Sequence, residues 1–145
     1  TAEFITNSFK TYRKYHCSAV AITQEIVDLM GNACGVAIQA NAANKVFLKQ
    51  EPNVIDSLKT FASLTEIEIE LLKSVETQKG KFSEALVISD SSRGVIRLVP
   101  DPLRYWLATS DAKENDYLEN MIQKFEGRYL EALKECAKEC PHGLH

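Results

Sequence analysis

The dipeptide Thr23-Gln24 has the clearest potential for chemistry in this sequence. It ends an almost wholly apolar run, residues 18–23, which is typical of a central strand covered on both faces. Ligands of open α/β sheets bind at the carboxyl ends of the strands, where Gln24 would stand. An uncharged amide there can orient a water molecule or hydrogen-bond a γ-phosphate. The alternative is that Thr23 and Gln24 only end the strand and cap the next helix.

Three basic residues flank the expected elements on either side of this dipeptide. Arg13 and Lys14 stand near the end of a helical pattern over residues 4–15, and Lys45 opens an expected strand over residues 45–49. Each has a structural interpretation. Arg13 and Lys14 fit a solvated helix face that complements the helix dipole, and Lys45 fits a strand edge kept in water.

Two motifs of a complete ATPase are missing from the sequence. There is no Gly-x-x-x-x-Gly-Lys-Ser/Thr loop to hold phosphates and no apolar strand that ends in an acidic pair to hold magnesium. We expect both to lie upstream of Thr1, within a larger parent chain. The 145-residue chain by itself is therefore expected to be inactive and to hold no cofactor.

Two thiols and two imidazoles gather near the C-terminus, at Cys136, Cys140, His142 and His145. Their number would suffice for a tetrahedral zinc site, but their spacing is not that of a zinc finger. Cysteines four residues apart lie on one helix face, where a buried free thiol behaves as a small hydrophobe. We therefore predict no metal.

The hydrophobic pattern predicts a mixed α/β fold. The expected helices cover residues 4–15, two short stretches within 25–43, residues 54–62, residues 65–75 and a terminal helix from residue 111 that Gly127 weakens by about 1 kcal/mol. Thr65 with Glu68 three residues later matches a capping box at the start of the helix over 65–75. The expected strands are residues 18–23, residues 45–49 and a hairpin of residues 82–89 and 95–99. Tyr105 and Trp106 are expected in the core rather than stacked on a base.

Composition narrows the class of protein further. With 45% hydrophobic and 26% charged residues, the chain has the makeup of an ordinary globular domain. A net charge of -3 argues against the uniformly positive surface of a nucleic-acid coat. Four cysteines in this setting indicate a reducing cytosol rather than a disulfide framework.

Several blocks of sequence together resemble one family. They are Tyr-Arg-Lys-Tyr-His-Cys-Ser-Ala-Val-Ala-Ile-Thr-Gln at residues 12–24, Ala-Asn-Ala-Ala-Asn-Lys-Val-Phe-Leu at 40–48, Phe-Ser-Glu-Ala-Leu-Val-Ile at 82–88, Gly-Val-Ile-Arg-Leu-Val-Pro-Asp-Pro at 94–102 and Trp-Leu-Ala-Thr-Ser-Asp at 106–111. In this order they resemble the TraC-like ATPases of conjugative type IV secretion systems. The resemblance implies the C-terminal half of a RecA-like P-loop fold, with parallel central strands, a β-hairpin and a terminal helical segment. Residues 1–110 would belong to the ATPase domain, and residues 111–145 would be a helical extension packed on it.

The same resemblance implies a function for the parent protein. It would be a hexamer that hydrolyses ATP with Mg at its subunit interfaces, at the cytoplasmic side of the inner membrane. It would contact inner-membrane secretion-channel proteins and energise pilus assembly and DNA transfer, without sequence-specific binding of nucleic acid. Gln24 would be the sensor glutamine beside Thr23, and Arg13 a candidate arginine finger, with Lys14 and Lys45 as weaker candidates for nucleotide contacts.

Two other functions remain open at this point. A hexameric motor that translocates DNA would use the same Thr-Gln strand, but it needs basic pore loops, and its binding to DNA would weaken steeply with salt. A non-catalytic protein-interaction module would need no nucleotide at all. The parent gene separates these readings, because a phosphate-binding loop upstream of Thr1 would favour a motor.

Overall fold

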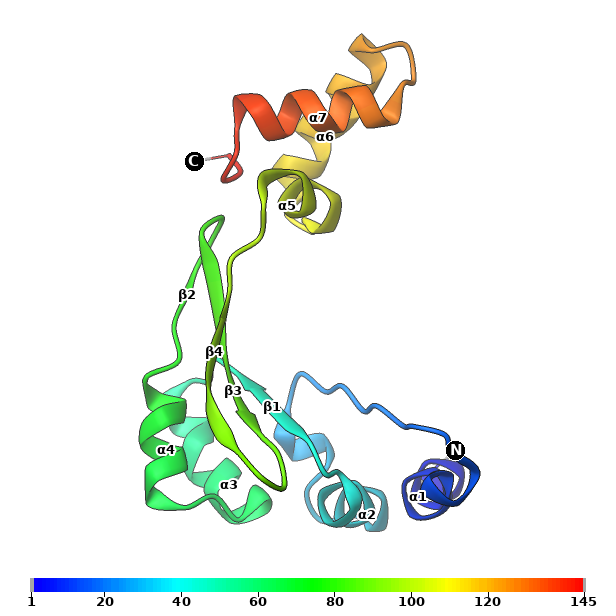
Figure 1. The fold of residues 1–145 in the computed structure, drawn as a ribbon, viewed down its shortest axis with the longest axis vertical. Helices are drawn as coiled ribbons and strands as arrows, with labels where there is room; N and C mark the ends of the chain where they lie inside the picture. The colour runs from blue at the N-terminus through cyan, green and yellow to red at the C-terminus, as the bar shows by residue number, and fades with distance from the viewer. Residues whose placement is uncertain (1, 145) are drawn as a thin grey trace. The chain divides into compact units, whose positions relative to one another are not determined.

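The computed structural model describes residues 2–144, so Thr1 and His145 lie outside the described residues. The chain forms two compact units, whose elements are labelled in Figure 1. The first unit comprises the residues up to Val75 together with Ala85–Ile96. The second comprises Glu76–Glu84 together with the residues from Arg97 onward. Helices and strands both contribute, which confirms the predicted α/β class.

Two helices that pack on each other begin the first unit. Helix α1 spans Ala2–Thr11 and continues into the 3-10 helix η1, Tyr12–Tyr15. A second 3-10 helix, η2 at Ile26–Asp28, precedes helix α2, Ala33–Asn41, and α1 packs against α2. The predicted break within residues 25–43 is therefore confirmed. It contains Gly31, at φ 73°, a left-handed conformation that side chains rarely adopt.

The sheet is built around strand β3, Phe82–Ile88. Strand β1, Lys45–Leu48, pairs with its second half, and the short β2, Thr77–Gln78, pairs with its start. Strand β4, Arg93–Leu98, also pairs with β3 and completes the predicted hairpin. The loop of this hairpin is closed by the Ser89 N–H, which donates to the Ser92 carbonyl at 2.8 Å.

The direction of pairing differs from the prediction of parallel central strands. Lys45 lies opposite Ile88 and Thr77 opposite Ser83, and both registers are antiparallel. The expected strand over residues 45–49 is confirmed as β1, but its neighbour runs the other way. A hydrophobic pattern identifies residues that fit a strand, whereas the direction of pairing depends on the path of the connecting chain, here helices α3 (Pro52–Ala62) and α4 (Glu66–Lys73).

The core of the first unit lies between one face of the sheet and two helices. Helix α3 spans Pro52–Ala62 and helix α4 spans Glu66–Lys73. Figure 1 shows both helices beside β3 and β4. The core side chains are all aliphatic: Ile55, Leu58, Leu64, Ile69, Leu72, Val75 and Leu86.

Helix α4 begins with the predicted capping box. The Thr65 hydroxyl accepts from the Glu68 N–H at 3.3 Å, and the Glu68 carboxylate accepts from the Thr65 N–H at 2.8 Å. These reciprocal bonds satisfy main-chain donors that the first turn of a helix leaves without partners.

Replacing Thr65 with alanine is expected to lower the free energy of unfolding by about 1 kcal/mol, the usual loss of an N-cap. Chemical denaturation followed by circular dichroism measures this change. Thr60→Ala is the matched control, because Thr60 is exposed within α3 and its hydroxyl only donates to the Asp56 carbonyl. Equal midpoints for the two variants would contradict the role of the cap.

Three helices form most of the second unit. They are α5, Pro102–Ala108, α6, Ala112–Lys124, and α7, Tyr129–Glu139. The first two begin at aspartates, since Asp101 and Asp111 each accept two main-chain N–H bonds with their side chains. The prediction of one long terminal helix is wrong. Glu126 and Gly127, at φ 55° and 83°, reverse the chain so that α6 and α7 pack on each other.

Candidate functional site

Gln24 lies between η1 and η2 with its side chain exposed, and it makes no hydrogen bond to another described residue. The neighbouring Thr23 is held locally. Its hydroxyl donates to the Glu25 carbonyl at 2.8 Å and lies 3.3 Å from Oδ2 of Asp28. These bonds belong to the turn that starts η2, so Thr23 acts structurally while the Gln24 amide remains available.

The segment before Gln24 is extended but not paired. Residues 18–22 make no main-chain hydrogen bond within the described chain, and Figure 1 shows them as a long stretch without regular structure between α1 and α2. Val20 is 83% exposed and Ile22 is 92% exposed. The run that the sequence predicts as a buried strand therefore has strand composition but no neighbouring strand here.

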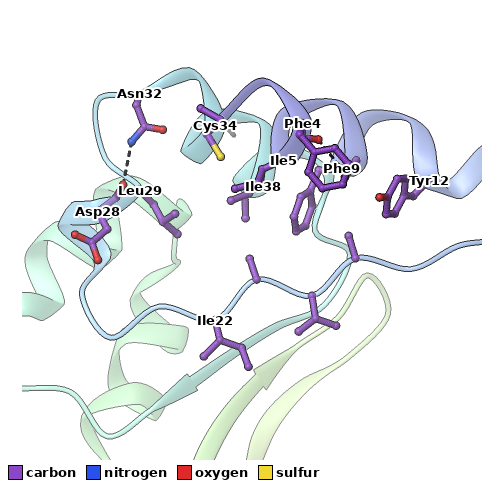
Figure 2. A pocket seen from close by; sticks show the side chains of 15 residues that line it. Phe4, Ile5, Phe9, Tyr12, Ile22, Asp28, Leu29, Asn32, Cys34 and Ile38 are labelled. Atoms are coloured by element: carbon purple, nitrogen blue, oxygen red, sulfur yellow. Dashed lines mark hydrogen bonds between the residues drawn. The ribbon is translucent and has the colours of Figure 1, made fainter.

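An apolar groove of about 780 Å³ lies beside this segment. Figure 2 shows its walls, with Phe4, Ile5 and Phe9 on α1, Ile38 on α2, and Ile22 across from them. Three of its polar side chains are bonded within the chain: the Ser8 hydroxyl donates to the Phe4 carbonyl, the Asn32 amide donates to the Asp28 carbonyl, and the Asp28 carboxylate accepts from the Thr23 hydroxyl. The groove thus suits an apolar occupant rather than a phosphate.

The basic candidates are not joined to Gln24 by any hydrogen bond or ion pair among residues 2–144. Arg13 and Lys14 are both exposed on η1. Lys45 is half-buried on β1, and its charge acts on Glu68. That neighbourhood supports a structural role for Lys45.

Glu68 is the centre of a small charged cluster on α4. Its pKa is lowered first by the hydrogen bond from the Thr65 N–H, and then by the Thr65 hydroxyl and the charges of Arg93 and Lys45. The Arg93 guanidinium lies 3.0 Å from the carboxylate. This cluster joins the sheet to helix α4, and its groups already satisfy one another.

The second unit contains a buried carboxylate that the sequence analysis missed. Glu114 is 0% exposed and accepts from the hydroxyls of Tyr105 and Thr109 and from the Leu144 N–H. Lys79 lies 3.4 Å from the same carboxylate. Burial raises the pKa of Glu114, but these four partners outweigh it and hold the pKa below its ordinary value.

The position of Glu114 in the sequence indicates that its carboxylate is buried. It stands one helical turn before Leu118 on α6, on the stripe that the core uses, and a carboxylate on such a stripe is buried only with partners. The hydroxyls of Tyr105 and Thr109 and the Leu144 N–H are all used on the carboxylate. Glu114 therefore has a structural role: it binds the C-terminal segment through the Leu144 N–H.

The aromatic and thiol candidates of the second unit lie in its core. Trp106 is 1% exposed, as predicted, and its ring lies 5.7 Å from that of Tyr117. Cys136 is fully buried, and burial raises the pKa of its thiol to about 11. Within residues 2–144 no three His, Cys, Asp or Glu side chains are arranged to hold a metal ion, and His145 lies outside the described residues.

No helix within residues 2–144 combines the length and the apolar character needed to cross a membrane.

Comparison with known proteins places the chain in a family. The family model of the TraG P-loop domain covers residues 1–140 of the chain. No curated protein and no solved structure gives a significant match. The matched range includes Gln24, the groove, the first unit and the second unit up to residue 140.

Proposed function

This chain belongs to the TraG P-loop domain family, and from that membership we propose that it is part of an ATPase that energises conjugative transfer by type IV secretion. The match over residues 1–140 is the observation that carries the proposal. The blocks between residues 12 and 111, which resemble TraC-like ATPases, point to the same class of motor.

The phosphate-binding part of the site would come from another segment of the same protein. A P-loop motor needs main-chain N–H groups and a lysine around the phosphates, and an acidic residue for magnesium. The printed sequence has no such loop. We therefore assign the binding of Mg-ATP to a segment outside these 145 residues, and the response to hydrolysis to this chain.

Gln24 is the residue proposed to respond. Its amide is exposed and unengaged within the described chain, while Thr23 is fixed to the turn of η2 by its bonds to Glu25 and Asp28. A free amide on an anchored turn has the chemistry to orient the attacking water, which is the task of a glutamine in related phosphoryl-transfer sites.

Arg13 is proposed as the cation that stabilises charge on the transferred phosphoryl group. Its guanidinium is exposed on η1, so a neighbouring subunit of a ring would have access to it. The proposed assembly is a hexamer at the cytoplasmic side of the inner membrane, with secretion-channel proteins as partners. Lys14 is a weaker candidate, and the effect of the Lys45 charge on Glu68 favours a structural role for Lys45.

Titration of the 145-residue chain with Mg-ATP is expected to give no measurable heat of binding, because the groups that hold the phosphates are absent from its sequence. Isothermal titration calorimetry makes this measurement. The protein that includes the P-loop segment is the control and should bind and hydrolyse ATP. Tight binding by the 145 residues alone would show that they contain a nucleotide site, against the proposed division of the site.

A further inference from the structure

The turn that carries Gln24 is joined to helix α2 by a chain of hydrogen bonds. The Thr23 hydroxyl lies 3.3 Å from Oδ2 of Asp28. The Asp28 carbonyl accepts from the Asn32 side-chain amide at 2.9 Å, the dashed line in Figure 2. The Asn32 Oδ1 accepts from the Gly35 N–H at 2.8 Å. Both polar atoms of the Asn32 side chain are therefore used, one on the turn and one on the helix.

The two polar atoms of Asn32 have different roles. Its side-chain oxygen caps α2, because Asn32 is the N-cap residue and satisfies a main-chain donor of the first helical turn. A cap of this kind needs only an oxygen, which serine supplies about as well as asparagine. The amide nitrogen is not needed for the cap. It donates to the Asp28 carbonyl and so connects the turn to the helix.

Close packing supports this connection. A Cβ at Gly35 would lie 1.6 Å from the carbonyl oxygen of Leu29, so only glycine lets η2 and α2 approach each other this closely. Ile26 of η2 packs against the aliphatic core of the first unit. The chain that follows Gln24 is thus fixed both to the core and to α2, whereas the Gln24 amide makes no hydrogen bond to another described residue.

We propose that Asn32 is a positioning residue for Gln24: its amide bond to Asp28 holds the turn that places the Gln24 side chain. This inference rests on the proposed function, in which Gln24 orients the attacking water. A displacement of about 1 Å in such a site lowers the rate by up to about 100-fold. Asn32 itself touches neither the nucleotide nor the water, so its loss should slow turnover without weakening nucleotide binding.

Asn32→Ser separates the two roles, because serine keeps a capping oxygen and lacks the amide donor. In the ATPase that carries this chain, it is expected to lower kcat about tenfold and to leave the dissociation constant of Mg-ATP within about twofold of the parental value. Asn41→Ala is the matched control, since the Asn41 amide donates to the Ala37 carbonyl at 2.8 Å at the other end of the same helix. An unchanged kcat for Asn32→Ser, or an equal loss in the control, would overturn the proposal.

A double-mutant cycle tests whether Asn32 acts through Gln24. In the Gln24→Ala background no amide is left to position, so Asn32→Ser should cause no further loss of kcat. If the same substitution lowers kcat as much in this background as in the parent, Asn32 affects hydrolysis independently of Gln24, and the positioning role is refuted.

Hydrogen exchange of the same protein tests the connection without relying on catalysis. The N–H groups of Asp28, Leu29 and Met30 donate to the carbonyls of residues 25–27 and so form η2. Asn32→Ser is expected to raise their exchange rates about twofold to tenfold, which corresponds to the loss of one hydrogen bond. Asn41→Ala should leave these rates unchanged. Equal rates in the parent and in Asn32→Ser would mean that the Asn32 amide does not hold the turn.

The outcomes separate this inference from the proposed function. If the protein hydrolyses no ATP, the proposed function is refuted, while faster exchange of η2 in Asn32→Ser would still support the hold of Asn32 on the turn. If Gln24→Ala slows hydrolysis and Asn32→Ser does not, the proposed role of Gln24 stands and the positioning role of Asn32 is refuted.

Discussion

Replacing Gln24 with alanine, in the ATPase that carries this chain, is expected to slow ATP hydrolysis by about 100-fold, the typical cost of losing one group that acts in the transition state. The affinity for Mg-ATP should stay nearly unchanged, because a group that positions water contributes little to ground-state binding. The free, exposed amide of Gln24 supports this split between binding and turnover.

Steady-state and single-turnover kinetics give the measurement, with the nucleotide dissociation constant determined separately. Gln123→Ala serves as the control, because Gln123 is an exposed glutamine of α6 in the second unit. Hydrolysis at the parental rate would remove Gln24 from the mechanism. A loss of affinity that matches the loss of rate would instead assign Gln24 to binding.

Replacing Trp106 with alanine is expected to destabilise the second unit by about 3–5 kcal/mol, the range for removing a buried aromatic side chain. Trp106 lies in the core cluster with Leu118, Met121 and Leu133. Its indole N–H also donates to the Cys140 carbonyl at 2.7 Å. The substitution would therefore remove packing and one of the two donors to the Cys140 carbonyl, which also accepts from the Gly143 N–H at 3.1 Å.

Urea denaturation followed by circular dichroism measures this loss. Tryptophan fluorescence cannot follow the unfolding of the Trp106 variants, because Trp106 is the single tryptophan of the chain. Leu130→Ala is the control for shortening an exposed side chain. Trp106→Phe keeps most of the packing and removes the N–H, so it should cost about 0.5–1.5 kcal/mol, the net contribution of one hydrogen bond, because the Cys140 carbonyl keeps its bond from the Gly143 N–H. A change below 1 kcal/mol for the alanine variant would contradict a core role for Trp106.

Local signals in the sequence predicted most elements. The three-residue spacing of Thr65 and Glu68 predicted the start of α4, because a capping box is formed by two residues at this spacing. The polar turn between two apolar runs predicted the β3–β4 hairpin for the same reason. Both features are decided by near neighbours in the chain, and both are present in the structure.

Features that depend on distant residues could not be predicted in the same way. The direction of β1 against β3 depends on how α3 and α4 return the chain, which no pattern within Lys45–Leu48 encodes. The stripe from Leu118 to Cys136 is continuous in the sequence, but left-handed backbone at Glu126 and Gly127 turns it into two helices. Glycine lowers helix stability only modestly, so its presence alone does not predict a reversal.

The candidate site shows the same division. The strand predicted over residues 18–23 from their apolar composition is wrong for this structure, because no strand pairs with them. The Thr23 hydroxyl bonds to Glu25 and Asp28, but it does not cap η2. The groove beside Ile22 could not be predicted, because its walls come from α1 and α2 and depend on how these helices pack. The partners of Glu114 were missed because Lys79 and Leu144 are brought to it only by the fold.

The contacts that hold the C-terminal segment of the second unit, at Glu114 and at Gly80, also bear on the order in which this unit folds. The His142 ring lies 3.1 Å from the carbonyl of Gly80, 62 residues earlier in the chain, and a Cβ at Gly80 would overlap the main chain of His142. Contacts between such distant residues form late, since the loop between them must close first. During synthesis, residues 140–144 emerge from the ribosome long after Gly80. The turn at Gly80 therefore stays exposed to solvent until His142 can pack against it.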